Sequence, residues 1–187
     1  PVSSAASDVY KRQVLRKPCI DITKSHADLD ILISNMFETM YAASGVGLAA
    51  PQINKSLRLF IVDTSPFKDD ENPDHEICKN VFINPKIISK SGDLWAFSEG
   101  CLSIPEVRED VKRYSNIEIE YYDENFNKKI ETFDSINARV ILHEYDHIEG
   151  ILFVDKVSPL RKRMIKGKLK DIVNGNLNAN YNIRGFK

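Results

Sequence analysis

Two histidines four residues apart, His143 and His147, frame the sequence HEYDH and constrain this chain more than any other feature. They lie in a segment that begins at Ser135 and is followed by Gly150, residues typical of the start and the end of a helix. Because successive residues of a helix are rotated by about 100°, both imidazoles lie on one face, one turn apart. The sequence therefore predicts a helix, from Ser135 to about Glu149, that presents two metal-ligating side chains to one site.

Glu144 directly follows the first of these histidines. A carboxylate at this position can act as a general base toward water without occupying a coordination position, a division of roles that favours hydrolysis. Catalytic metal sites usually have three protein ligands and one open position. Two histidines are therefore not enough, and a third ligand must come from elsewhere in the chain.

The common zinc-peptidase patterns do not supply that third ligand. A metzincin would place a histidine six residues after His147, but no histidine follows it, and no glutamate follows Glu149 as a thermolysin-like site would require. The remaining strong donor is Cys101, in the sequence EGCLS, because a thiolate binds divalent iron or zinc well. We predict Cys101 as the third ligand, with Asp155 and Asp171 as alternatives.

The composition excludes several classes of protein. The chain has 187 residues, 42% of them hydrophobic, which is enough for one core, and no segment reaches the roughly 20 consecutive apolar residues that span a bilayer. Its 26 basic and 27 acidic residues create no overall field that would attract DNA. Three cysteines are a sparse, odd set for a disulfide framework and indicate a reducing compartment. We therefore expect a cytoplasmic protein of one domain, with no membrane or DNA partner.

The first thirteen residues differ in character from the rest. Residues 3–13 read SSAASDVYKRQ, without apolar periodicity, and resemble the in-frame translation of a transposase-based sequencing adapter. We interpret residues 1–13 as a non-native tail of a sequence assembled from environmental DNA, and residues 14–187 as the single domain. An ordinary disordered tail is the alternative interpretation.

The remaining elements fall into separate groups of helices and strands. Apolar periodicity predicts further helices at 25–43 and 159–173, and extended segments at 57–63, 81–88, 117–121 and 129–133. The last two extended segments flank a turn and form an expected hairpin. Because the helices and strands are segregated rather than alternating, the predicted class is α+β.

A glycine-rich segment, GVGLAAPQ at 45–52, follows the first helix. Its small residues let a backbone approach another chain or a ligand closely. Gln52 adds an amide donor, which can polarise a carbonyl whose oxygen gains charge when water attacks. The alternative interpretation of this segment is a helix stop followed by a tight turn.

Taken together, the three segments resemble the peptide deformylase family. Its signature consists of GφGφAAxQ, EGCLS and QHExDH in that order, where φ is apolar, and only Leu142 departs from it, at the position of the usual glutamine. The resemblance covers most of residues 14–173. It implies small antiparallel or mixed β-sheets packed around a central metal-binding helix, with a C-terminal helix.

The resemblance also implies a reaction, the removal of formyl from the N-terminal formylmethionine of newly made proteins, with release of formate. Glu144 would take the proton of the attacking water and deliver it to the departing amine, while Gln52 and the backbone N–H of Leu102 hold the formyl oxygen. The implied cofactor is one divalent ion, Fe²⁺, with Zn²⁺, Ni²⁺ or Co²⁺ as alternatives that ligand spacing does not discriminate. The implied ligands are Cys101, His143 and His147.

Substrate-binding and supporting residues follow from the same resemblance. The stretch from Gly45 to Gly47 would pair with the peptide backbone as an added strand. Glu99 would pair with Arg113, and Asp146 would support the site, although Leu142 cannot donate the hydrogen bond that glutamine would give to Asp146. The implied substrate-binding residues are Gly45, Val46, Gly47, Arg139 and Val140.

Two rival functions use the same residues. One is a metallopeptidase or another metal-dependent amidohydrolase that acts on a different N-terminal group, and the other is a structural metal-binding domain, which usually has four ligands.

The segment 159–173 has basic residues on one side and apolar residues on the opposite side. A solvated helix face explains this pattern, and the alternative is contact with ribosomal RNA near nascent chains. The basic residues are Arg161, Lys162, Arg163, Lys166, Lys168 and Lys170, and the apolar ones are Leu160, Met164, Ile165, Leu169 and Ile172.

Overall fold

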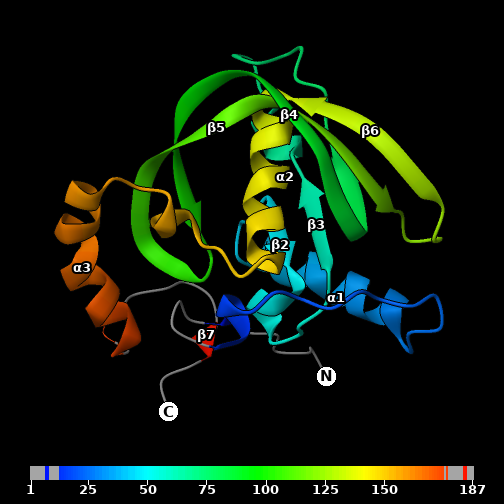
Figure 1. Cartoon of the computed structure of the whole chain (residues 1–187), viewed down its shortest axis with the longest axis horizontal. Coiled ribbons are helices and arrows are strands. Elements are labelled where there is room, and N and C mark those ends of the chain that lie inside the picture. The colour runs from blue at the N-terminus through cyan, green and yellow to red at the C-terminus, as the bar shows by residue number, and fades with distance from the viewer. Residues whose placement is uncertain (1–6, 9–12, 175, 177–182, 185–187) are drawn as a thin grey trace.

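A computed structural model describes residues 7–8, 13–174, 176 and 183–184 of the chain (Figure 1). Its main sheet has five antiparallel strands in the order β2-β3-β4-β5-β6. These strands are β2 (Gly47–Ala49), β3 (Leu59–Asp63), β4 (Lys79–Cys101), β5 (Ile104–Tyr122) and β6 (Lys128–Asp134). The helices are α1 (Leu29–Ala42), α2 (Ser135–Ile148) and α3 (Pro159–Val173), with short 3₁₀ turns η1 (Gln13–Arg16), η2 (Ala50–Ile53), η3 (Ser65–Phe67) and η4 (Phe153–Asp155).

Helix α2 lies at the centre of the molecule, and the curved strands β4 and β5 arch over it (Figure 1). Most of its residues are buried, which is expected of a helix enclosed on several sides. Its apolar side chains, such as Ile141 and Ile148, pack in one cluster with Phe60, Phe82 and Ile119 of the sheet. This packing fixes the helix that carries both histidines, so the site rests on the core rather than on a loop.

The predicted α+β class and the three helices are confirmed, with small shifts at the ends. Helix α1 begins at Leu29 because the residue before it, Asp28, has a left-handed backbone conformation (φ 57°), which does not continue a right-handed helix. Helix α3 begins at Pro159, where the Ser158 side chain accepts a hydrogen bond from the N–H of Arg161. The expected hairpin at 117–133 is also present, as strands β5 and β6.

The long hairpin of β4 and β5 is the part of the sheet that sequence patterns predicted only in pieces. The two strands run from Lys79 to Tyr122 with one tight connection at residues 102–103. Their pairing contains four register shifts, and each shift interrupts the alternation of inward and outward residues. Much of β4 is also exposed on both faces, so its middle lacks the apolar alternation by which a strand is recognised.

The five apolar residues of α3 differ in burial. Leu160 and Met164 are 67% and 64% exposed, whereas Ile165 and Ile172 are buried. The apolar side chains of α3 that pack against the rest of the protein are Ile165, Leu169 and Ile172, which are three or four positions apart and so share one narrow face of the helix. Leu160 and Met164 lie beside that face.

Residues 1–13 lie largely outside the described residues, and their interpretation as a non-native tail stays a prediction. Two described residues among them, Ser7–Asp8, form strand β1, which pairs in parallel with β7 (Ile183–Arg184). Gln13 is the first residue of η1. Among the residues that the structure describes, no helix has the length and apolar character needed to cross a bilayer.

Candidate functional site

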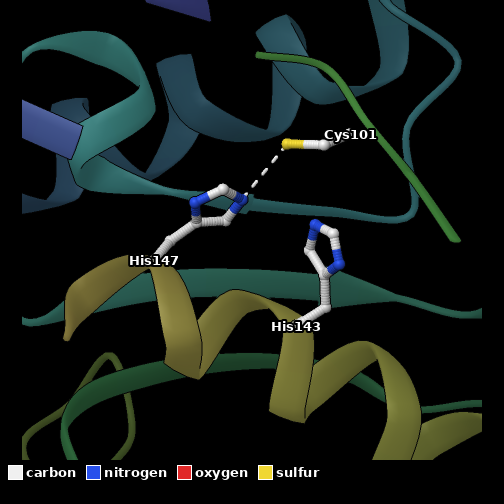
Figure 2. Close-up of side chains that lie close together, drawn as sticks. All are labelled: Cys101, His143 and His147. Carbon is white, nitrogen blue, oxygen red and sulfur yellow. Dashed lines mark hydrogen bonds between the residues drawn. The ribbon is translucent and has the colours of Figure 1, made fainter. Parts of the chain in front are cut away.

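Cys101, His143 and His147 converge on one point, with their ligand atoms within 4.8 Å of one another. Cys101 ends strand β4 and points toward the two histidines, which stand one turn apart on α2 (Figure 2). The Cys101 Sγ lies 3.3 Å from His147 Nε2. One thiolate and two imidazoles are a donor set that suits divalent iron or zinc, so these residues fit a metal ion.

The sulfur of Cys101 is surrounded by hydrogen-bond donors. The backbone N–H of Ser103, in the turn that follows β4, lies 3.4 Å from Sγ, and the side-chain Nε2 of Gln52 lies 3.6 Å from it. Donors of this kind stabilise a thiolate, which is the form of cysteine that binds a metal. The turn between β4 and β5 therefore places the sulfur beside the two histidines and provides one of its donors.

Glu99 holds the first histidine from behind. His143 Nδ1 lies 3.0 Å from Glu99 Oε2, and Arg113 donates two hydrogen bonds to the same carboxylate, at 2.6 and 2.9 Å. Burial opposes ionisation, but the hydrogen bonds from Arg113 and His143 keep the pKa of Glu99 well below its usual range. The expected pairing of Glu99 with Arg113 is confirmed, and it leaves Nε2 of His143 as the nitrogen that can bind a metal.

Glu144 lies beside the glycine-rich segment. It is 4% exposed, and its Oε2 has no hydrogen-bond partner among the described residues. A Cβ atom on Gly47 would lie 2.5 Å from Glu144 Oε1, so only glycine leaves room for the carboxylate. Burial raises the pKa of Glu144 to about 7, against the lowering effect of His143 and Arg113. A carboxylate with that pKa suits the exchange of protons near neutral pH.

Gln52 is buried with its amide in a fixed orientation. Its Oε1 accepts a hydrogen bond from the backbone N–H of Ala49 at 2.8 Å, so its Nε2 faces Cys101 and the Ser103 hydroxyl, 3.3 Å away. Leu102 follows Cys101 directly and lines the adjacent cavity. The two residues expected to hold a carbonyl oxygen therefore both lie next to Cys101, Gln52 through space and Leu102 along the chain.

A cavity of about 660 Å³ is lined by two of the ligand residues, Cys101 and His143, and by Glu144. Its wall includes all five residues that the sequence assigned to substrate binding: Gly45, Val46, Gly47, Arg139 and Val140. It also includes Phe67, Phe97 and Ile136, which sequence reasoning missed. Ile136 could have been predicted, because it lies four residues before Val140 and therefore on the same face of α2. Phe67 and Phe97 could not, because only the fold brings them to the cavity.

Asp146 is held by cations rather than by its neighbour on the helix. Arg113 Nη1 lies 2.6 Å from one of its oxygens, and Lys156 Nζ lies 3.1 Å from the other. Leu142 packs in the apolar cluster, and its backbone carbonyl accepts a hydrogen bond from Arg113 at 3.3 Å. Arg113 therefore ties Asp146 to Glu99, a connection that does not need a polar side chain at position 142.

The chain is similar to known proteins over nearly its whole length. The sequence model of the family described as polypeptide deformylase matches residues 8–163. A peptide deformylase from Christiangramia forsetii is 55% identical over 181 residues, covering 94% of this chain and 92% of the relative. Another from Flavobacterium psychrophilum is 53% identical, covering 94% and 93%.

Solved structures give the same result. A crystal structure of peptide deformylase from Plasmodium falciparum superposes with a TM-score of 0.81 and 33% identity, covering 90% of this chain and 95% of that one. A peptide deformylase from Legionella pneumophila gives a TM-score of 0.77 and 36% identity, with the same two coverages.

Proposed function

Because the chain belongs to the peptide deformylase family, we propose that the site formed by Cys101, His143 and His147 is its catalytic centre. The enzyme is a metal-dependent hydrolase that removes the formyl group from the N-terminal formylmethionine of newly made proteins and releases formate. The convergence of a thiol and two imidazoles beside a buried carboxylate that lines a cavity is the observation that carries this assignment.

The three ligand residues would hold one divalent ion. Bound there, the ion supplies Lewis acidity, which lowers the pKa of water and polarises a carbonyl. We propose Fe²⁺, on the resemblance to the family, while the donor set also suits Zn²⁺, Ni²⁺ and Co²⁺. Burial lowers the pKa of His147 well below its usual value, so this imidazole is in the neutral form that a ligand requires.

Glu144 is the general base in this proposal. Its carboxylate takes a proton from the water that adds to the formyl carbon, and it later gives that proton to the amine nitrogen when the carbon–nitrogen bond breaks. The position over Gly47 and the burial of Oε2 keep the carboxylate aimed at the space beside the ligands. Glu99 also lines the cavity, but its carboxylate is already bound by Arg113, Arg139 and His143.

Gln52 and Leu102 hold the formyl oxygen in this proposal. The oxygen gains negative charge when water adds, and the Gln52 amide and the Leu102 backbone N–H would donate hydrogen bonds to it. Gln52 cannot rotate freely, because Ala49 occupies its Oε1. A donor fixed before the reaction stabilises the developing charge without a cost of reorganisation.

The peptide is expected to bind along strand β2. In the described part of the sheet, β2 pairs only with β3, and Gly45, Val46 and Gly47 at its start line the cavity. Backbone pairing at Gly45–Gly47 tolerates many sequences, while Val46 and Val140 offer apolar wall for the first side chain.

The activity is tested with two substrates that differ only in the acyl group. We expect protein made without oxygen to hydrolyse formyl-methionyl peptides and to leave acetyl-methionyl peptides intact. Metal content measured on the same sample identifies the ion. Comparable turnover of the acetyl peptide would instead support a broader metal-dependent amidohydrolase.

We also propose that the basic face of α3 contacts ribosomal RNA. Arg161 is engaged by Glu109 at 2.6 Å, so the exposed cations Arg163, Lys166 and Lys170, which share one face, are better placed to meet phosphates. Substitution of these three by glutamine should weaken ribosome co-sedimentation and flatten its salt dependence, without changing turnover of short formyl peptides.

The matched control for this prediction removes cations from the sheet, through Lys90→Gln, Lys128→Gln and Lys129→Gln together. If both triple variants co-sediment like the parent protein, or if the parent does not co-sediment, α3 presents an ordinary solvated face.

A further inference from the structure

Arg139 is the largest fully buried side chain of the described structure, although it carries a charge. It lies on α2 one turn before His143. Its Nη1 donates to Glu99 Oε1 at 2.7 Å and to the carbonyl of Val111 at 2.9 Å, and its Nη2 donates to the carbonyl of Trp95 at 2.7 Å. The guanidinium therefore connects α2 to both strands of the long hairpin.

An aromatic side chain covers the same guanidinium. The Arg139 Cζ lies 4.1 Å from the centre of the Trp95 ring, a stacking distance, and 5.5 Å from that of Phe97. The guanidinium is thus held by three hydrogen bonds and by the Trp95 ring. Although Arg139 contributes to the cavity wall, both terminal nitrogens of its guanidinium donate to protein groups, and its Nε is buried without a hydrogen-bond partner among the described residues.

Two arginines, Arg113 and Arg139, donate hydrogen bonds to the Glu99 carboxylate. Its Oε1 accepts from Arg113 and Arg139, and its Oε2 accepts from Arg113 and His143. Arg113 also pairs with Asp146 at 2.6 Å, so its charge is shared between two carboxylates. Arg139 supplies the second cation, and its hydrogen bond anchors the carboxylate end that lies farther from His143.

We propose that Arg139 is a positioning residue of the metal centre, which fixes Glu99 and, through Glu99, the ring of His143, and that it does not recognise the substrate. The proposal rests on the function assigned above, because it takes His143 as a metal ligand. It differs from the expectation that the family resemblance implied, in which Arg139 is one of the substrate-binding residues.

The test compares Arg139→Gln and Arg139→Lys with the parent protein, each stripped of metal and refilled with Co²⁺. We expect Arg139→Gln to raise the dissociation constant for Co²⁺, measured by chelator competition, by about 10- to 100-fold, as loss of a partner behind a ligand does. The visible spectrum of the Co²⁺ protein should also shift. Lysine retains one donor toward Glu99, so Arg139→Lys should recover part of both effects.

Kinetics separate positioning from recognition. With formyl-methionyl and formyl-norleucyl peptides, Arg139→Gln should lower kcat by the same factor and leave the ratio of the two KM values unchanged. A change in that ratio, with metal affinity within twofold of the parent, would overturn the proposal in favour of a substrate contact. Failure of the parent to hydrolyse either peptide would refute the proposed function, while the Co²⁺ affinities would still decide the role of Arg139.

Two further variants test whether the effect passes through Glu99. In a Glu99→Gln background, Arg139→Gln should add less than twofold to the loss of Co²⁺ affinity, because residues that act in one chain are not additive. Arg58→Gln is the matched control, since Arg58 is also mostly buried and pairs with Glu149 and the carbonyl of Pro85, both at 2.7 Å. The Arg58→Gln variant should have a lower Tm than the parent protein and the same affinity for Co²⁺. Additive losses, or an equal loss of affinity in the control, would show that Arg139 acts only through general stability.

Discussion

Glutamine in place of Glu144 is expected to abolish most turnover and to leave the metal bound. Glutamine has the shape of glutamate and fits the space over Gly47, but its amide cannot accept a proton from water. We expect kcat for a formyl-methionyl peptide to fall by about 10²–10⁴-fold, the range typical of a lost general base. The metal ligands Cys101, His143 and His147 are untouched by the substitution.

Metal content per chain and Tm, measured on the same preparation, show whether this loss is chemical. Both should match the parent protein, because the substituted side chain is neither a ligand nor a partner of the Arg113 network. Retention of more than about a tenth of the parent kcat would contradict a role of that size for Glu144.

The central helix and its ligands were predictable because their signals are local. The spacing of His143 and His147 defines one helix face, and the sequence EGCLS supplies the only other strong donor in context. The comparison of alternatives for the third ligand also needed nothing beyond the sequence. In the structure, Cys101 lies within hydrogen-bonding distance of His147. No local sequence pattern predicts this contact, because the two residues belong to different elements.

The support behind the ligands was predictable only in part. Glu99 and Arg113 meet as expected, but the two bonds from Arg139 to β4 and β5 depend on the pairing of a hairpin whose register shifts four times. Trp95 and Arg139 are far apart in the chain, so their stacking follows from the arch of that hairpin over α2. Sequence patterns report periodicity along one segment, whereas this contact depends on the curvature of another.

Alanine in place of Cys101 is expected to remove the metal itself. Two histidines remain, and without the thiolate they form a weaker site than the three ligands that a catalytic metal usually requires. We expect metal per chain to fall to near zero after gel filtration, and turnover to fall with it. Added metal should restore little activity, because the missing donor is part of the site rather than a means of loading it.

The control for this variant is another buried cysteine. Cys78 is 5% exposed in the apolar cluster, and burial raises its pKa to about 12, so it stays a neutral thiol away from the site. Cys78→Ala should lower Tm, because it leaves a cavity, while keeping full metal content and turnover. Full metal content in Cys101→Ala would assign the third ligand to another donor. Asp155 is a weak candidate for that role, because one of its carboxylate oxygens is already bound by Arg16 and by the N–H of Leu152.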